Sequence, residues 1–159
     1  MHERARHLID TLGLIPHPEG GWYRELFHSR IRVARGDDLR PGLTTIYFLL
    51  VRGTHSRWHR VRSDEAWHFY EGDPIELLTI EPADVAVRGA QLGPVAEYSQ
   101  PVLVVHAGAW QAARPLGEYA LVGCSVGPGF DFADFELLAD LPDELGRFSG
   151  RLGEFRRLV

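Results

Sequence analysis

The stretch 53–72, GTHSRWHRVRSDEAWHFYEG, carries the most informative pattern in the chain. In it, His59 is followed six residues later by Glu65 and then by His68, with a glycine at each end. Two short runs that flank the polar residues 62–64 predict adjacent strands of a hairpin. A histidine and a carboxylate on neighbouring strands can point toward one place, which suits a metal site or a proton-transfer site.

Outside this stretch, short runs of β-forming residues recur about every ten residues, with turn residues between most of them. No helical periodicity separates these runs, so the sequence predicts one all-β domain over 1–159, a sandwich or a closed jelly roll. Short helices are predicted at 3–12 and after Pro142, and 30–42 is predicted to be a surface loop. The predicted strands are 22–28, 43–52, 75–80, 85–88, 90–92, 102–106, 109–113 and 118–126.

Composition excludes several classes of function. The formal net charge of −5 argues against a nucleic-acid partner. All 17 basic residues are arginine, which excludes Schiff-base and lysine-base chemistry. No apolar run approaches the length of a membrane span, and the N-terminus lacks the apolar centre of a signal peptide, so we expect a cytoplasmic protein without a membrane partner. Cys124 lies in a predicted strand and is expected to be a buried, unreactive thiol.

The spacing within 53–72 resembles the first motif of the cupin superfamily, a glycine, His-x-His, a glutamate and a second glycine. His59 and Glu65 fall on ligand positions of that motif, whereas Val61 replaces its second histidine. The second cupin motif is similar to residues 106–115, where Gly108 is kept and Gln111 stands at the position of the third histidine ligand.

Four further segments resemble one cupin subgroup that was long filed as a domain of unknown function, and the resemblance covers about 8–141. They are HPEGGWYRE at 17–25, LTTIYFLL at 43–50, WHRVRSDEAWHFYEGDPIELL at 58–78 and LVGCSVGPGFDFADFELL at 121–138. This resemblance implies a double-stranded β-helix, the cupin jelly-roll barrel, with short N- and C-terminal helices. It also implies a polar pocket inside the barrel that takes a small molecule, and a homodimer.

Two interpretations of the motif residues stay open. In the first, His59, Glu65 and Gln111 hold one divalent transition metal ion, although an amide oxygen is a poor substitute for an imidazole. In the second, no metal is bound, and His59 and Glu65 form an acid/base pair in which the carboxylate orients the ring. His68 is a further candidate catalytic residue, but the alternation of a strand would point it away from Glu65. Tyr47, among other tyrosines, is a candidate for a second acid/base group.

Other residues are candidates for holding the ligand. The turn HPEGG brings Glu19 and Arg24 beside aromatic residues, where Arg24 would grip a carboxylate or phosphate; a structural salt bridge is the alternative. Trp67 and Trp110 flank the two motifs, where they suit the wall of a sugar site and equally the core of a barrel. Tyr47 and Gln111 complete the predicted ligand-binding set.

Three functions follow from these alternatives. The first is an epimerase- or isomerase-like enzyme acting on a sugar or sugar nucleotide through the His/Glu pair. The second is a metal-dependent, oxygenase-like enzyme, and the third is a ligand-binding or storage protein. The substitutions Val61 and Gln111 favour the first and the third over the second. Because buried ionisable groups are costly, the polar groups kept in an apolar barrel favour the first over the third.

Overall fold

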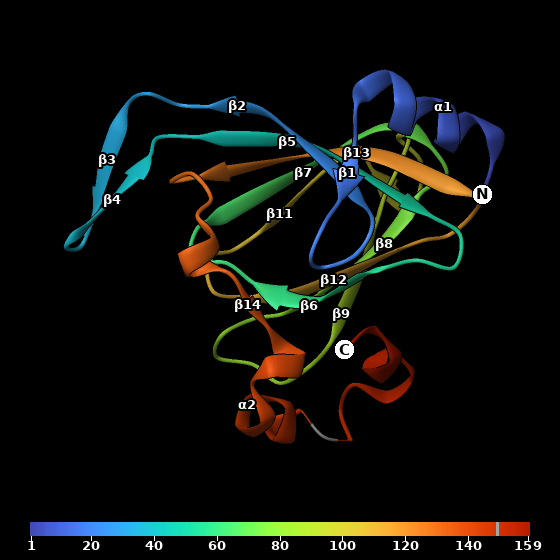
Figure 1. Ribbon diagram of the computed structural model, residues 1–159. Helices are drawn as coiled ribbons and strands as arrows, with labels where there is room; N and C mark the ends of the chain where they lie inside the picture. The colour runs from blue at the N-terminus through green and yellow to red at the C-terminus, as the bar shows by residue number, and fades with distance from the viewer. Residues whose placement is uncertain (149) are drawn as a thin grey trace.

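Two six-stranded sheets face each other and form a barrel in the computed structural model, which describes residues 1–148 and 150–159 (Figure 1). The first sheet has the order β1 (Ile15–Pro16), β2 (Trp22–His28), β5 (Thr44–Val51), β13 (Tyr119–Gly127), β7 (Asp64–Gly72), β11 (Val102–Val105). The second has the order β10 (Ser99–Gln100), β9 (Arg88–Leu92), β8 (Ile75–Ile80), β12 (Trp110–Pro115), β6 (Ser56–Arg60), β14 (Glu136–Leu137). The predicted all-β jelly roll is confirmed.

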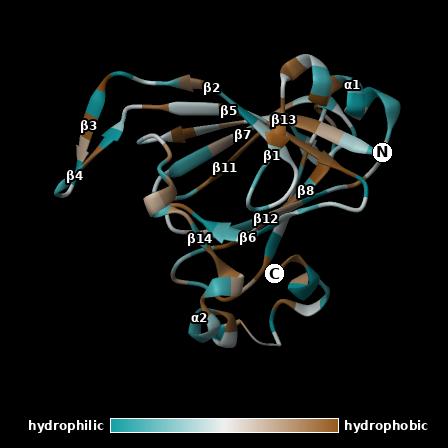
Figure 2. Cartoon of the chain, in the orientation of Figure 1, coloured by the Kyte–Doolittle hydropathy of each residue, from teal (hydrophilic) through white to brown (hydrophobic). Residues whose placement is uncertain are grey.

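Strand alternation separates the barrel interior from the outer layer. In β5, the side chains of Ile46, Phe48 and Leu50 belong to the interior core, whereas the intervening Leu49 belongs to a cluster on the outer face. That outer cluster is covered by α1 (Glu3–Leu12), the helix predicted at the N-terminus, as Figure 1 shows. In Figure 2, α1 carries both brown apolar and teal polar positions, as a helix that packs one face on a sheet and exposes the other requires.

The C-terminal segment covers the outer face of the second sheet. It comprises η2 (Leu138–Asp140), α2 (Pro142–Arg147) and η3 (Gly153–Leu158), drawn in orange to red in Figure 1. The short η1 (Phe132–Asp134) precedes this segment. Trp58 and Trp110 are buried against this segment, and the Trp58 indole N–H donates a hydrogen bond to the Phe155 carbonyl at 3.0 Å. Trp58 and Trp110 therefore serve this outer core, whereas Trp67 belongs to the interior core.

Two predictions about local structure are wrong. The stretch 53–72 is not a hairpin, because β6 pairs with β12 and β14, whereas β7 pairs with β13 and β11. The three residues 61–63 carry the chain from one sheet to the other, so its two halves face each other across the barrel. Residues 30–42 are not a loop but a hairpin of β3 (Arg32–Arg35) and β4 (Asp38–Pro41), which projects as an arm in Figure 1.

A third prediction, the strand at 85–88, is also wrong: β9 begins only at Arg88. The Asp84 carboxylate accepts hydrogen bonds from the backbone N–H groups of Val85 and Ala86, at 2.7 and 3.1 Å. A side chain that bonds its own backbone in this way competes with strand pairing.

Among the described residues, no helix has the length and apolar character needed to cross a membrane.

Candidate functional site

A cavity of about 210 Å³ opens inside the barrel and is lined by residues of both sheets and of the segment that follows β13. Its wall combines ionisable groups with aromatic rings and small apolar side chains. The lining residues are His17, Glu19, Tyr23, Glu25, Thr44, Ile46, His59, Val61, Glu65, Cys124, Val126, Phe130, Phe132 and Phe135.

The turn HPEGG places the Glu19 carboxyl in this cavity. Gly20 and Gly21 have φ values of 112° and 70°, which residues with a side chain rarely adopt. A Cβ at Gly20 would also collide with a backbone carbonyl, so the turn can pack against the barrel only with glycine there. The backbone N–H of Arg57 donates to the Glu19 carbonyl at 2.8 Å, which fixes the turn on β6. Glu19 is consequently only 6% exposed.

Glu19 and His59 share one proton. The His59 Nδ1 lies 2.7 Å from the Arg57 carbonyl oxygen, which can only accept, so Nδ1 carries a hydrogen. The other ring nitrogen, Nε2, lies 3.1 Å from Glu19 Oε2. Two atoms that both have lone pairs would repel at this distance, so a proton lies between them. The Ser56 hydroxyl donates to the second Glu19 oxygen at 2.9 Å and fixes the carboxyl plane.

Burial makes the neutral form of this pair the favoured one. Removal from water raises the pKa of Glu19 to about 8, against smaller opposing effects of the Ser56 hydrogen bond and the Arg57 charge. Burial likewise lowers the pKa of His59. It also lowers the pKa of His17, the neighbouring imidazole, to about 4. At neutral pH the shared proton therefore belongs to Glu19, which donates it to an uncharged His59.

Glu65 enters the cavity from β7, in the opposite sheet. One of its oxygens accepts a hydrogen bond of 2.6 Å from the Gln111 amide. The amide orientation is fixed because the Gln111 oxygen accepts from the Trp67 indole at 3.0 Å. Burial raises the pKa of Glu65, while the nearby His59 and the Gln111 hydrogen bond act against that shift. Burial also raises the pKa of Cys124, which matches the expected inert thiol.

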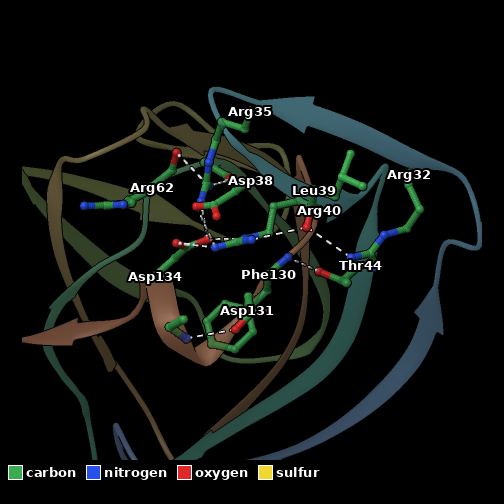
Figure 3. A network of polar contacts seen from close by, with 12 residues as sticks. Arg32, Arg35, Asp38, Leu39, Arg40, Thr44, Arg62, Phe130, Asp131 and Asp134 are labelled. Atoms are coloured by element: carbon green, nitrogen blue, oxygen red, sulfur yellow. Dashed lines mark hydrogen bonds and ion pairs between the residues drawn. The ribbon is translucent and has the colours of Figure 1, made fainter.

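An aromatic wall closes another side of the cavity. The ring centroid of Phe130 lies 5.0 Å from that of Phe132 and 6.1 Å from that of Phe135. These rings belong to a segment that is tied to the projecting hairpin through Asp134, whose carboxylate receives Arg35 at 2.5 Å and Arg40 at 2.8 Å (Figure 3).

The Phe130 backbone N–H also donates to the Thr44 hydroxyl at 2.9 Å. The hairpin and the start of β5 together hold the aromatic wall in position.

The structure brings three of the sequence-predicted site residues together at the cavity, namely Glu19, His59 and Glu65. Gln111 is fully buried behind Glu65, and Trp67 lies behind Gln111.

The other predicted residues lie away from the cavity. His68 has the opposite strand parity to Glu65, and Tyr47 packs on the outer face of the first sheet with its ring centroid 6.0 Å from that of Tyr70. Arg24 donates to the Leu12 carbonyl at the end of α1, at 2.9 Å. Trp110 belongs to the outer core, with the Arg60 guanidinium 4.6 Å from its ring centroid.

Several cavity residues were missed by the sequence reasoning. Tyr23 and Glu25 share one face of β2 and line the cavity. The alternation of residues along this strand shows which side chains share a face, but it does not show which face is internal. His17 stands in the same turn as Glu19. The phenylalanines of 130–135 follow the last long strand and could be recognised only as an aromatic run, because the hairpin that fixes them is distant in sequence.

The donor set does not fit the predicted metal site. The Gln111 oxygen is occupied by Trp67, both nitrogens of His59 have partners, and Val61 occupies the second motif position without a donor atom. Within the described part of the chain, no group of three or more His, Cys, Asp or Glu side chains is arranged to hold a metal ion. The structure shows these side chains as hydrogen-bond partners of one another and of the backbone.

Comparison with known proteins identifies the family. The family model described as Cupin superfamily (DUF985) matches residues 6–138. A solved structure from Shewanella oneidensis is 33% identical with a TM-score of 0.85, and the alignment covers 97% of this chain and 96% of that one. A hypothetical protein from Leishmania major is 32% identical with a TM-score of 0.78, covering 92% and 97%.

More distant similarity extends to oxalate decarboxylase from Bacillus subtilis, at 14% identity and a TM-score of 0.59, covering 79% of this chain and 30% of that one. At this identity the likeness concerns the fold alone. No curated protein matches the chain. The family match over most of the length, together with the barrel and its internal cavity, establishes that the chain belongs to the cupin superfamily, in the family described as DUF985.

Proposed function

We propose that the cavity binds a small molecule and transfers protons to and from it, as isomerases and epimerases do. The observation that carries this proposal is the contact of 3.1 Å between Glu19 Oε2 and His59 Nε2 inside a closed, partly apolar cavity. Such a pair can deliver the Glu19 proton to a ligand and recover a proton at the same carboxyl. A general acid or base works best when its pKa lies near the working pH, and the pKa of Glu19, at about 8, meets this condition.

Glu65 supplies the second group that the chemistry requires. Epimerisation beside a carbonyl needs a base on one side of the carbon and an acid on the other. Glu19 and His59 reach the cavity from the HPEGG turn and β6, whereas Glu65 reaches it from β7 in the facing sheet. We propose that the substrate lies between these two groups, with Gln111 as a positioning residue that orients the Glu65 carboxyl.

Cavity size limits the substrate. Pockets for drug-sized ligands range from about 300 to 1,000 Å³, and this cavity measures about 210 Å³. A sugar-sized molecule suits that volume, whereas the nucleotide of a sugar nucleotide would remain outside. Mn(II) centres are described for the oxalate decarboxylase of similar fold. Because the donor set here does not fit a metal, we favour metal-free proton transfer over the oxygenase-like alternative.

Exchange of carbon-bound hydrogen with solvent tests the proposal. The protein is incubated in D₂O with aldoses, ketoses and amino sugars, and deuterium beside the carbonyl group is followed by NMR. We expect exchange with at least one compound, and a loss of at least about 100-fold in Glu19→Gln and in His59→Asn. Glu97→Gln, an exposed carboxyl away from the cavity, is the matched control. Absence of exchange across the panel would favour a non-catalytic binding protein, whereas parental rates in both variants would contradict the roles of Glu19 and His59.

A further inference from the structure

The cavity wall carries several carboxyl groups but no arginine. Of its lining residues, three are glutamates, Glu19, Glu25 and Glu65, and two are histidines, while none is an arginine, although the chain has 17. Burial lowers the pKa of both histidines, so neither offers a permanent positive charge. Recognition of a phosphate or carboxylate normally relies on arginine or lysine. The cavity wall therefore provides no partner of that kind for an anionic ligand.

Aromatic rings make up much of the remaining surface. Tyr23 and three phenylalanines line the cavity, and the Phe132 and Phe135 ring centroids lie 6.3 Å apart. The face of an aromatic ring attracts a cation, and the attraction strengthens when both groups are shielded from water. Carboxylates combined with aromatic rings are the usual surroundings of a bound ammonium group.

We propose that the ligand of this cavity carries an ammonium group, primary or quaternary, held between the buried glutamates and the aromatic wall. This inference rests on the proposed function, since it names the substrate class of the same cavity. Glu25 has a side chain that is 53% exposed, so it meets an arriving cation first, whereas Glu19 and Glu65 lie deeper. An amino sugar has both the ammonium group and the carbon acid that proton transfer requires.

Binding of a cation changes the proton count of the cavity. Burial keeps a proton on Glu19 up to about pH 8, and a positive ligand favours the ionised carboxylate instead. One proton should then leave as the cation binds, and the affinity should rise as the pH approaches 8. The ionisable or charged groups around Glu19 are His17, Tyr23, Glu25, Arg57, His59, Glu65 and Cys124.

Choline and its uncharged carbon isostere, dimethylbutanol, form the decisive pair of probes, because they share one shape and differ in charge. The charge of choline does not titrate, so any pH dependence belongs to the protein. Binding to the full chain is measured by titration calorimetry at pH 6.5 and pH 8, with acetate as the anionic probe. We expect choline to bind at least about tenfold more tightly than dimethylbutanol, and to bind more tightly at pH 8.

Variants locate the effect. Glu19→Gln and Glu65→Gln should each weaken choline binding at least about tenfold without changing the affinity for dimethylbutanol, and Glu97→Gln should leave both affinities unchanged. The proposal is overturned by an absence of saturable choline binding, by equal affinity for the two isosteres, or by tighter binding of acetate. Choline binding without any deuterium exchange would refute the proton-transfer function alone, whereas exchange in neutral sugars without choline binding would refute the cation alone.

Discussion

The shared proton of Glu19 should appear in the pH dependence of stability. Between pH 4.5 and about pH 8 the folded protein keeps a proton on Glu19 that the unfolded chain releases. The contribution of this group to the free energy of unfolding is therefore complete below pH 4.5 and is lost as the pH rises to 8. Each pH unit in that interval removes about 1.4 kcal/mol.

His17 acts in the opposite direction over part of the same range. Its pKa falls from 6.5 to about 4 on folding, so its contribution is present above pH 6.5 and is lost as the pH falls to 4. The two slopes oppose each other below pH 6.5. From pH 6.5 to pH 8 the Glu19 slope is free of that opposition, and it amounts to about 2 kcal/mol.

Glu19→Gln isolates this effect, because its amide can donate to His59 Nε2 as the protonated carboxyl does but cannot ionise. We expect the stability of the variant relative to the parent to increase by about 2 kcal/mol between pH 6.5 and pH 8. Urea unfolding at both pH values measures the difference, with Glu97→Gln as the matched control. A constant stability difference between parent and variant at the two pH values would refute the shared, burial-stabilised proton.

Other predictions concern the supports of the site. Asp134→Asn should lower the free energy of unfolding by about 2 kcal/mol in urea titrations, because it leaves Arg40 with only the exposed Asp38 carboxylate; an unchanged value would contradict the anchoring role. Gln111→Leu should cost about 2–4 kcal/mol, since the Glu65 carboxyl and an indole N–H both lose a partner, and a neutral result in the same assay would argue against that network. Cys124 should react with a thiol reagent far more slowly in the folded than in the unfolded protein, because burial raises its pKa; equal rates would contradict that environment.

The fold could be predicted from the sequence because its signals are local. Apolar alternation, turn residues and the glycines of 53–72 indicated where the strands lie. Four segments also matched one family. The sequence did not show which strands pair with each other. His59 and Glu65 were predicted to share a hairpin. The prediction failed because nothing in the local sequence shows that the three residues between β6 and β7 carry the chain into the opposite sheet.

The candidate site, too, could be predicted from the sequence only in part. His59 and Glu65 could be identified from motif spacing, and strand parity alone placed His68 on the other face. The partner of His59 could not be identified, because Glu19 is forty residues away and reaches the cavity only when a two-glycine turn packs on β6. Arg24 was expected to grip a ligand, but the same turn directs it to the end of α1.

The sequence by itself determined the class of fold, the family and which residues of a strand share a face, because periodicity and spacing are properties of short segments. Only the tertiary structure decided which ionisable groups meet, and with what protonation. The pKa of Glu19 rises because several distant segments together exclude water from it. The aromatic wall is held in position because Asp134 pairs with two arginines of the hairpin. Exclusion of water is a collective property of the packed chain, so no single segment encodes it.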